Sequence, residues 1–266
     1  MKHNLLEICY LIGSVTFIIG MKMMGNAKTA RRGNLIGAVG MTIAILGTIF
    51  LHEGHEVSGL IYGMIFGAIG LGTLIGWLTA KKVQMTKMPE LVSMFNGMGG
   101  ACAALISLIE FNAYQTPGHP AASTGTMIAI IAGLIIGSIS FSGSIIAYLK
   151  LNGTMNKPIR LPAYNIINTI VMIGVFAYGG YIVYSGGSMM HAYAVFGAAI
   201  VYGIMFAVPI GGADMPVVIS LLNSFTGLAA AFGGFLYDNY VMLTGGILVG
   251  SAGTLLTLEM CKAMNR

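Results

Sequence analysis

Long apolar runs recur along the whole chain and alternate with short stretches that contain charged residues, Pro or Gly. Each run has about 20 residues, the length that a helix rising about 1.5 Å per residue needs to cross a bilayer core of about 30 Å. Backbone polar groups inside lipid must be satisfied within the segment, so we predict that every run is a helix. The predicted spans cover approximately residues 4–24, 33–52, 58–80, 88–109, 123–149, 163–184, 191–210, 214–236 and 239–261. This pattern predicts an all-α fold, a polytopic transmembrane helical bundle of about nine helices.

The composition favours lipid as the main solvent. Hydrophobic residues make up 56% of the 266 residues and charged residues 8%, against about 25% charged in an average soluble domain. The net charge of +5 does not indicate nucleic-acid binding, because the basic residues lie in short connections between the apolar runs. No nucleotide-binding, zinc-protease or catalytic-triad motif of a soluble enzyme is present. We therefore expect no metal site and no residue that catalyses hydride transfer in this chain.

The distribution of Lys and Arg predicts the orientation of the bundle. When the nine spans are counted in order, twelve of the thirteen basic residues fall on one side of the membrane and only Lys2 on the other. The positive-inside rule makes the basic side cytoplasmic, so the N-terminus is expected outside and the C-terminus in the cytoplasm. Several acidic and histidine residues then fall in or beside the outer connections, where we interpret them as solvated surface: His52, Glu53, His55, Glu56, Glu110, His119, His191 and Asp238.

The fourth and eighth spans are related in sequence. Residues 88–104 match residues 215–231 at a constant offset of 127, with Met-Pro followed by Ser, Asn, Gly and Ala-Ala at the same spacing. Copies that lie four helices apart enter the membrane from the same side, so the repeat is predicted to be parallel. It covers about 58–149 and 191–261 within a single transmembrane domain of residues 1–266. Repeat interfaces near the membrane midplane are common places for transporter sites.

Amides and hydroxyls are the deepest polar groups of the predicted spans. Asn96 and Asn223 lie about 12–14 Å from the inner ends of their helices, close to half of the hydrocarbon thickness. Small and hydroxyl residues flank both at helical spacing, and Ser144 gives the fifth span a similar polar stripe. Such stripes commonly hold membrane helices together through hydrogen bonds worth about 0.6 kcal/mol on average. A hydrated path between the three stripes explains the same pattern, and spacing alone leaves both interpretations open.

Asp214 precedes a Met-Pro pair at the predicted inner end of the eighth span. Asp is a favoured N-cap residue, and its charge suits the positive end of a helix dipole, so a structural cap is one interpretation. The functional interpretation is a gate, or a docking point for a cytoplasmic partner.

Several stretches together resemble the beta subunit of proton-translocating NAD(P) transhydrogenase, and the resemblance covers essentially the whole chain in order. The longest begins Ile210-Gly-Gly-Ala-Asp-Met-Pro and continues through Leu-Leu-Asn-Ser-Phe-Thr-Gly. The others are residues 88–92, 96–100, 141–144, 250–253 and 260–266.

The resemblance implies that the chain conducts protons in an assembly that couples hydride transfer between NAD(H) and NADP(H) to proton passage across the inner membrane. In that family, the residues that match Asn96, Ser144, Asn223 and Gly253 are associated with the proton path. Thr226, one turn beyond Asn223, fits the same lining.

The resemblance also implies partners. The residue that matches Asp214 lies at the cytoplasmic mouth and faces a nucleotide-binding domain. An alpha subunit and a dimeric assembly are expected, and NAD(H) and NADP(H) are expected on partner or missing domains, with no cofactor in this chain.

Two departures from the family pattern matter. Many beta subunits have a His where this chain has Asn96, and His is suited to taking and releasing a proton near neutral pH. With Asn at this position, the titrating group is expected to come from a partner chain. The family also continues into an NADP(H)-binding domain with a Rossmann-like fold, whereas this sequence stops at Arg266, so that domain is expected to be missing or supplied separately.

Two other functions compete with the transhydrogenase. The parallel repeat is compatible with a stand-alone secondary transporter or ion channel, which would move its substrate without any partner. A structural anchor, in which the buried amides only pack helices together, is the third hypothesis.

Overall fold

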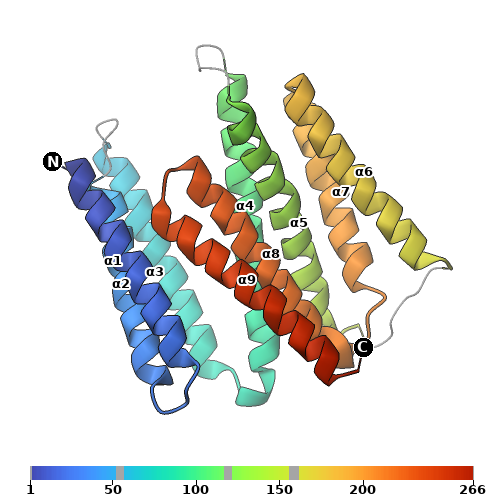
Figure 1. Cartoon of the computed structure of the whole chain (residues 1–266), viewed down its shortest axis with the longest axis horizontal. Coiled ribbons are helices and arrows are strands. Elements are labelled where there is room, and N and C mark those ends of the chain that lie inside the picture. Colours follow the sequence, from blue (N-terminus) through green and yellow to red (C-terminus); the bar gives the residue numbers. More distant parts are fainter. Residues whose placement is uncertain (1, 52–56, 117–121, 156–161, 266) are drawn as a thin grey trace. The chain divides into compact units, whose positions relative to one another are not determined.

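The structure is a computed structural model that describes residues 2–51, 57–116, 122–155 and 162–265, which fold into helices without a β-strand (Figure 1). Nine α-helices of these residues are long and apolar enough to cross a membrane, which confirms the predicted all-α bundle. Their bounds are α1 Lys2–Met24, α2 Ala30–Leu51, α3 Gly59–Lys82, α4 Met88–Gln115, α5 Thr124–Leu151, α6 Tyr164–Ser185, α7 Met189–Ala207, α8 Met215–Leu236 and α9 Tyr240–Ala263. Two short 3-10 helices, η1 Met85–Lys87 and η2 Gly212–Asp214, precede α4 and α8.

The predicted helix ends differ most from the structure in α4, which continues six residues beyond the predicted end, to Gln115. The boundary was placed before Glu110 because of its charge, but no Gly or Pro interrupts the sequence there, so the helix continues. Helix α7 ends at Ala207 rather than 210, since Pro209 cannot continue a helix. His52, Glu53, His55, Glu56 and His119 lie outside the described residues.

The chain divides into two compact units, Met1–Leu91 and Val92–Arg266. In the first unit, α1 and α2 pack side by side as a helical hairpin (Figure 1). Their contact includes a hydrogen bond of 3.1 Å between the Tyr10 and Thr48 hydroxyls. No residue of α3 is buried within the described part of the unit.

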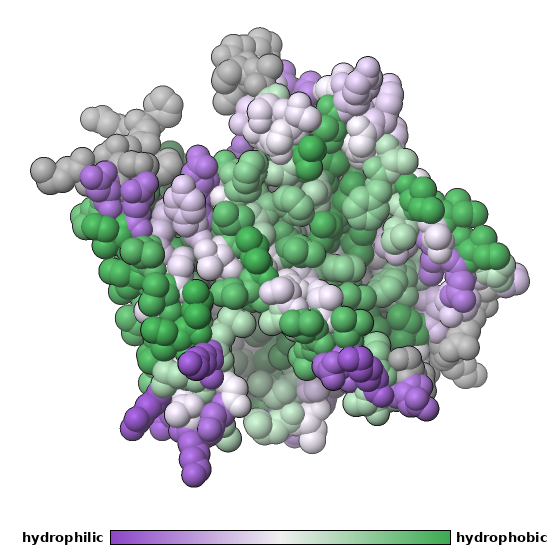
Figure 2. All heavy atoms as spheres, viewed as in Figure 1, coloured by the Kyte–Doolittle hydropathy of each residue, from purple (hydrophilic) through white to green (hydrophobic). Residues whose placement is uncertain are grey.

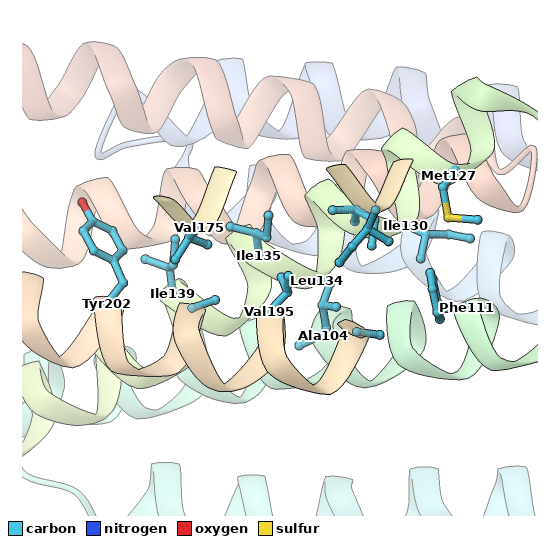
Figure 3. Close-up of a cluster of buried hydrophobic side chains, with 14 residues drawn as sticks. Ala104, Phe111, Met127, Ile130, Leu134, Ile135, Ile139, Val175, Val195 and Tyr202 are labelled. Atoms are coloured by element: carbon cyan, nitrogen blue, oxygen red, sulfur yellow. The ribbon is translucent and has the colours of Figure 1, made fainter. Parts of the chain in front are cut away.

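In the second unit, α5 is the central helix, buried along most of its length and packed against α6, α7 and α8. The main apolar cluster joins its aliphatic side chains to residues of α4, α6 and α7, among them Phe111, Val175 and Val195 (Figure 3). On the face shown in Figure 2, hydrophobic residues cover the middle of the helices, and hydrophilic residues gather near the helix ends. This distribution fits helices whose middle parts lie in lipid.

Two glycines allow α4 to approach α5 closely. A Cβ atom added to Gly100 would lie 2.7 Å from the Gly137 carbonyl oxygen, and one added to Gly137 would lie 2.8 Å from the Gly100 carbonyl oxygen. Any side chain at either position would push the helices apart, as at the small-residue contacts of membrane helices generally. The close approach places the polar stripe of α4 directly against α5.

Candidate functional site

A hydrogen-bonded polar cluster lies where α4, α5 and α8 meet. The Asn96 side chain is 8% exposed, and its amide Nδ2 donates to the Ser144 hydroxyl at 2.9 Å and to the Ser140 hydroxyl at 3.3 Å. The Ser140 hydroxyl lies 2.5 Å from the Thr226 hydroxyl of α8. Three of the five residues predicted for the path, Asn96, Ser144 and Thr226, are therefore brought together, with Ser140 between them.

The hydroxyls of this cluster have more acceptors in reach than protons to donate. Ser140 Oγ is within 2.9 Å of the Leu222 carbonyl oxygen, and Thr226 Oγ1 is within 3.2 Å of the same oxygen. Each hydroxyl has a single proton, so it can point either to this carbonyl or to the other hydroxyl. The pair can thus exchange donor and acceptor roles without moving the helices.

The carbonyl oxygen of the Asn96 side chain is buried and accepts no hydrogen bond from the described residues. A buried polar atom without a partner costs about 1–3 kcal/mol, and native proteins satisfy nearly all such atoms. The atom is therefore suited to accept from a water molecule or from a donor on another chain.

The local sequence explains why Asn96 reaches α5. Ser140 and Ser144 are four residues apart, so both hydroxyls lie on one face of α5. Gly97 follows Asn96, and a Cβ atom there would lie 3.2 Å from the Ser144 Cβ. The absent side chain leaves the Ser144 hydroxyl open to the amide.

Asn223 and Gly253 do not join this cluster. Asn223 is exposed on α8 and has no hydrogen bond to a described residue, whereas Gly253 is buried in the contact between α9 and α8. The Gly253 carbonyl oxygen accepts from the Ser220 hydroxyl at 3.3 Å. The predicted stripe of α8 is therefore divided among three surroundings: Thr226 contacts the cluster, Ser220 contacts α9 and Asn223 faces outward.

Asp214 is half-buried at the N-cap position of α8, but its side chain makes no capping hydrogen bond to that helix. Asp214 therefore occupies the predicted N-cap position, but the expected capping hydrogen bond from its side chain is not formed. Its backbone continues the preceding 3-10 helix, and its φ and ψ of −93° and −3° differ from the extended conformation typical of a capping residue.

Sequence reasoning missed Lys150, which was counted only as a basic loop residue. The side chain is buried in the last turn of α5, and its Nζ donates to three backbone carbonyl oxygens at the end of α7 and just beyond it. Its position at helical spacing after Ile139, Gly143 and Ala147, on an otherwise apolar face of α5, was the available signal.

Glu110 and Tyr237 form a second missed contact, at the other end of the same helices. The Tyr237 hydroxyl donates to Glu110 Oε1 at 2.6 Å and so joins α4 to the end of α8. The two positions are 127 residues apart, which is the offset of the sequence repeat. Partial burial, together with the Glu110 carboxylate, raises the pKa of the Tyr237 phenol above its ordinary value.

Comparison with known proteins decides the family. The family model for the NAD(P) transhydrogenase beta subunit matches residues 6–266. The chain belongs to this family. Two curated relatives, both the NAD(P) transhydrogenase subunit beta of Rhodospirillum rubrum and one of them from a defined strain, are each 39% identical over 270 residues. The alignments cover 100% of this chain and 57% of each relative.

Membership of the beta subunit family confirms the resemblance that the sequence motifs suggested. It favours the transhydrogenase over a stand-alone transporter or ion channel. Together with the nine membrane-type helices of the described residues, it identifies the chain as a membrane protein. The chain spans about 57% of the length of the curated relatives that it matches.

Proposed function

We propose that this chain is the membrane-spanning, proton-conducting part of an NAD(P) transhydrogenase. Such an enzyme couples hydride transfer between NAD(H) and NADP(H) to proton movement across the membrane. Family membership supports the proposal, and one structural observation carries it. A hydroxyl and amide cluster, Asn96 with Ser140, Ser144 and Thr226, is buried between α4, α5 and α8 and keeps one acceptor atom unused by the described residues.

The proposed enzyme needs further parts. An alpha subunit and an NADP(H)-binding domain would hold NAD(H) and NADP(H) and carry out hydride transfer, as a dimeric assembly in the inner membrane. The described helices offer the nucleotides no phosphate-binding loop, so we assign no step of hydride transfer to this chain. Its contribution is proton passage and its coupling to the cytoplasmic parts.

The cluster has chemistry suited to proton passage but not to proton storage. The hydroxyls of Ser140 and Thr226 can each donate or accept, so water in contact with them can pass a proton along by reorientation of hydrogen bonds. The Asn96 amide does not titrate, so the group that takes up and releases the proton belongs to a partner chain. The unused carbonyl oxygen of Asn96 is the acceptor that such a group, or a bound water, would approach.

The remaining predicted residues are assigned by the same proposal. Asn223, exposed on α8, lines the part of the path that a partner helix completes. Gly253 allows α9 to lie close to α8 next to this part of the path, because a Cβ atom added at Gly253 would lie 3.0 Å from the Ser224 Cβ. Asp214 forms the inner mouth, where the nucleotide state of the cytoplasmic domains makes the path open to one side or the other.

The test is proton-coupled transhydrogenation in sealed vesicles that contain the complete enzyme. Asn96→Leu removes the amide at nearly constant volume and should lower coupled proton transfer by at least about tenfold, because it removes the unused acceptor oxygen together with both hydrogen bonds to α5. Asn112→Leu is the matched control, since Asn112 is exposed on the same helix.

The outcomes separate the hypotheses. A tenfold loss with Asn96→Leu and none with Asn112→Leu supports a proton path at the cluster. Unchanged coupling in a stably folded Asn96→Leu enzyme would leave the cluster as helix packing only, which is the structural-anchor hypothesis.

A further inference from the structure

Lys150 is a buried cation with a complete set of backbone partners. It is the second-to-last residue of α5 and is 6% exposed. Its Nζ donates to the carbonyl oxygens of Ala207 at 3.1 Å, Val208 at 2.5 Å and Ile210 at 2.5 Å. An ammonium group has three donors, so these three carbonyls account for all of its hydrogen-bonding capacity.

The three acceptors belong to one short connection. Helix α7 ends at Ala207, so these carbonyls are among those that no helical N–H satisfies, and a cation at a helix C-terminus is stabilising. Asp214 follows Ile210 by four residues, through η2. The Lys150 ammonium group thus binds the segment 207–210, which leads directly into Asp214 and α8.

Apolar packing surrounds the same connection. Ala147, one turn before Lys150, is fully buried in a small cluster with Met215 and Leu222 of α8, and Ile210 packs against this cluster. The end of α5, the end of α7 and the start of α8 are therefore joined by apolar contacts as well as by Lys150.

Helix α5 also contacts the Asn96 cluster, through Ser144. Ser144 lies six residues before Lys150, about 9 Å along the axis of α5, and accepts the hydrogen bond of Asn96. Both contacts depend on one continuous, buried helix. A displacement of the connection between α7 and α8 must either break the Lys150 hydrogen bonds or move α5, and with it Ser144, relative to Asn96.

We propose that Lys150 is a positioning residue that locks the connection between α7 and α8, and with it Asp214, to α5. The role assigned to this lock rests on the proposed function: it transmits a change at the inner mouth to the Asn96 cluster. Lys150 itself transfers no proton, because its donors are all committed to backbone carbonyls.

The experiment combines hydrogen exchange with coupled transport in the complete enzyme. Lys150→Met keeps the aliphatic stem but removes the three donors. We expect the amides of Val208, Ile210 and Asp214, which donate to backbone carbonyls, to exchange at least about tenfold faster, which is the effect of losing hydrogen bonds to a charged group worth about 1.5–3 kcal/mol in total. Coupled proton transfer should fall by a similar factor, and Lys150→Arg, which keeps the charge, should restore part of both.

Lys262→Met is the matched control. Lys262 lies in the last turn of α9, is exposed, and pairs with Glu259 at 2.7 Å. This variant should leave both the exchange of the Val208, Ile210 and Asp214 amides and coupled transport within about twofold of the parent enzyme, as expected for an exposed ion pair.

If Lys150 acts by positioning Asp214, and does not only stabilise the fold, the effects of changing the two residues should depend on each other. Lys150→Met and Asp214→Asn should be less than additive in coupled transport, because the first acts through the position of the second. Additive losses would overturn the proposal, as would Lys150→Met with unchanged exchange and transport.

The parent enzyme provides a test that is independent of variant folding. The amides of Val208, Ile210 and Asp214 should be strongly protected from exchange in it, and free exchange of all three would overturn the lock. A parent enzyme that moves no protons would instead overturn the proposed function, while the exchange results would still decide whether Lys150 holds the connection.

Discussion

Helices α4 and α8 contain the same motif, yet their two asparagines have different surroundings. Both helices follow a 3-10 helix, and in both the motif packs on the next membrane helix through a small-residue contact. The Ser93 hydroxyl donates to the Ser144 carbonyl of α5, as the Ser220 hydroxyl does to the Gly253 carbonyl of α9. Asn96 is nevertheless buried in a polar cluster, whereas Asn223 is exposed.

The residue after each asparagine explains the difference. Gly97 leaves the Ser144 hydroxyl free for Asn96, but the matching position on α8 is Ser224. The Ser224 hydroxyl lies 2.8 Å from the hydroxyl of Thr254, which follows Ala252-Gly253 on α9 as Ser144 follows Ser142-Gly143 on α5. Ser224 thus takes the partner that Asn223 would have needed. The two copies pack on their neighbours in the same way, but they differ in the residue after the asparagine, and the Asn223 side chain stays exposed.

Asn223→Leu gives the largest expected effect. In the complete enzyme, coupled proton transfer should fall by about a hundredfold if a partner helix completes the path at this amide, equivalent to about 2.7 kcal/mol. Thermal stability of the chain should be unchanged, because Asn223 makes no hydrogen bond to a described residue. The measurements are proton uptake in sealed vesicles and a melting curve of the purified enzyme.

Leu228→Asn is the control for a general effect of polarity on α8, since Leu228 is exposed on a different face of this helix. Coupling that survives Asn223→Leu would show that the outward-facing amide is no part of the path.

Gly137→Ala should have the next largest effect, on stability. The added Cβ would lie 2.8 Å from the Gly100 carbonyl oxygen and 2.9 Å from the Ala104 amide nitrogen, both on the α4 backbone. Overpacking of this kind costs about 1–3 kcal/mol and should also weaken the Asn96 hydrogen bonds to α5. Resistance to thermal unfolding in detergent, measured against Gly174→Ala, checks this.

Gly174 has no atom within 4 Å of an added Cβ, so its replacement by Ala should be neutral or slightly stabilising in a helix. Equal melting temperatures for the two variants would contradict the close contact of α4 and α5.

Exchanging the residues that follow the asparagines tests whether these residues decide the surroundings of Asn96 and Asn223. A Cβ atom added at Gly97 would lie 3.2 Å from the Ser144 Cβ. Gly97→Ser should therefore place a hydroxyl beside Ser144 and displace the Asn96 amide. Coupled transport should fall by about tenfold, since a hydrogen bond worth about 1 kcal/mol is lost and crowding is added.

Ser224→Gly is the reciprocal change. It should lower stability by about 1 kcal/mol through the lost hydrogen bond to Thr254, with coupling retained. If Gly97→Ser leaves transport intact while Ser224→Gly abolishes it, the two copies have the reverse of the roles assigned here.

Particular residues show what the sequence could and could not predict. Helix number followed from the apolar runs, because a run of about 20 residues matches the length of a membrane helix, which satisfies its own backbone polar groups. The meeting of Asn96 and Ser144 followed from polar stripes at helical spacing. The outward position of Asn223 did not, since it depends on the side chain of the neighbouring Ser224. Lys150 was missed because a basic residue at a helix end usually reaches water, whereas here backbone carbonyls at the end of α7 and just beyond it replace the water.

Tyr237 gives the smallest expected effect. Its hydroxyl bonds Glu110 at the repeat-related position of α4, and the side chain is 48% exposed. Tyr237→Phe should therefore lower stability by less than about 1 kcal/mol and leave coupling unchanged. Tyr240→Phe is the control, since Tyr240 is similarly exposed at the start of α9.

The Tyr237 phenol should make the stability of the folded chain fall, not rise, at high pH. The pKa of the Tyr237 phenol is raised in the folded chain, so the folded state keeps its proton at a pH where an unfolded tyrosine, with a pKa of about 10, begins to lose it. Below pH about 10 both states are protonated and stability is independent of this group. Above it the unfolded state binds fewer protons, so stability should fall as pH rises, and less steeply in Tyr237→Phe than in the parent. Parallel stability curves for the two proteins between pH 9 and 11 would show that the Tyr237–Glu110 contact does not hold the phenol proton.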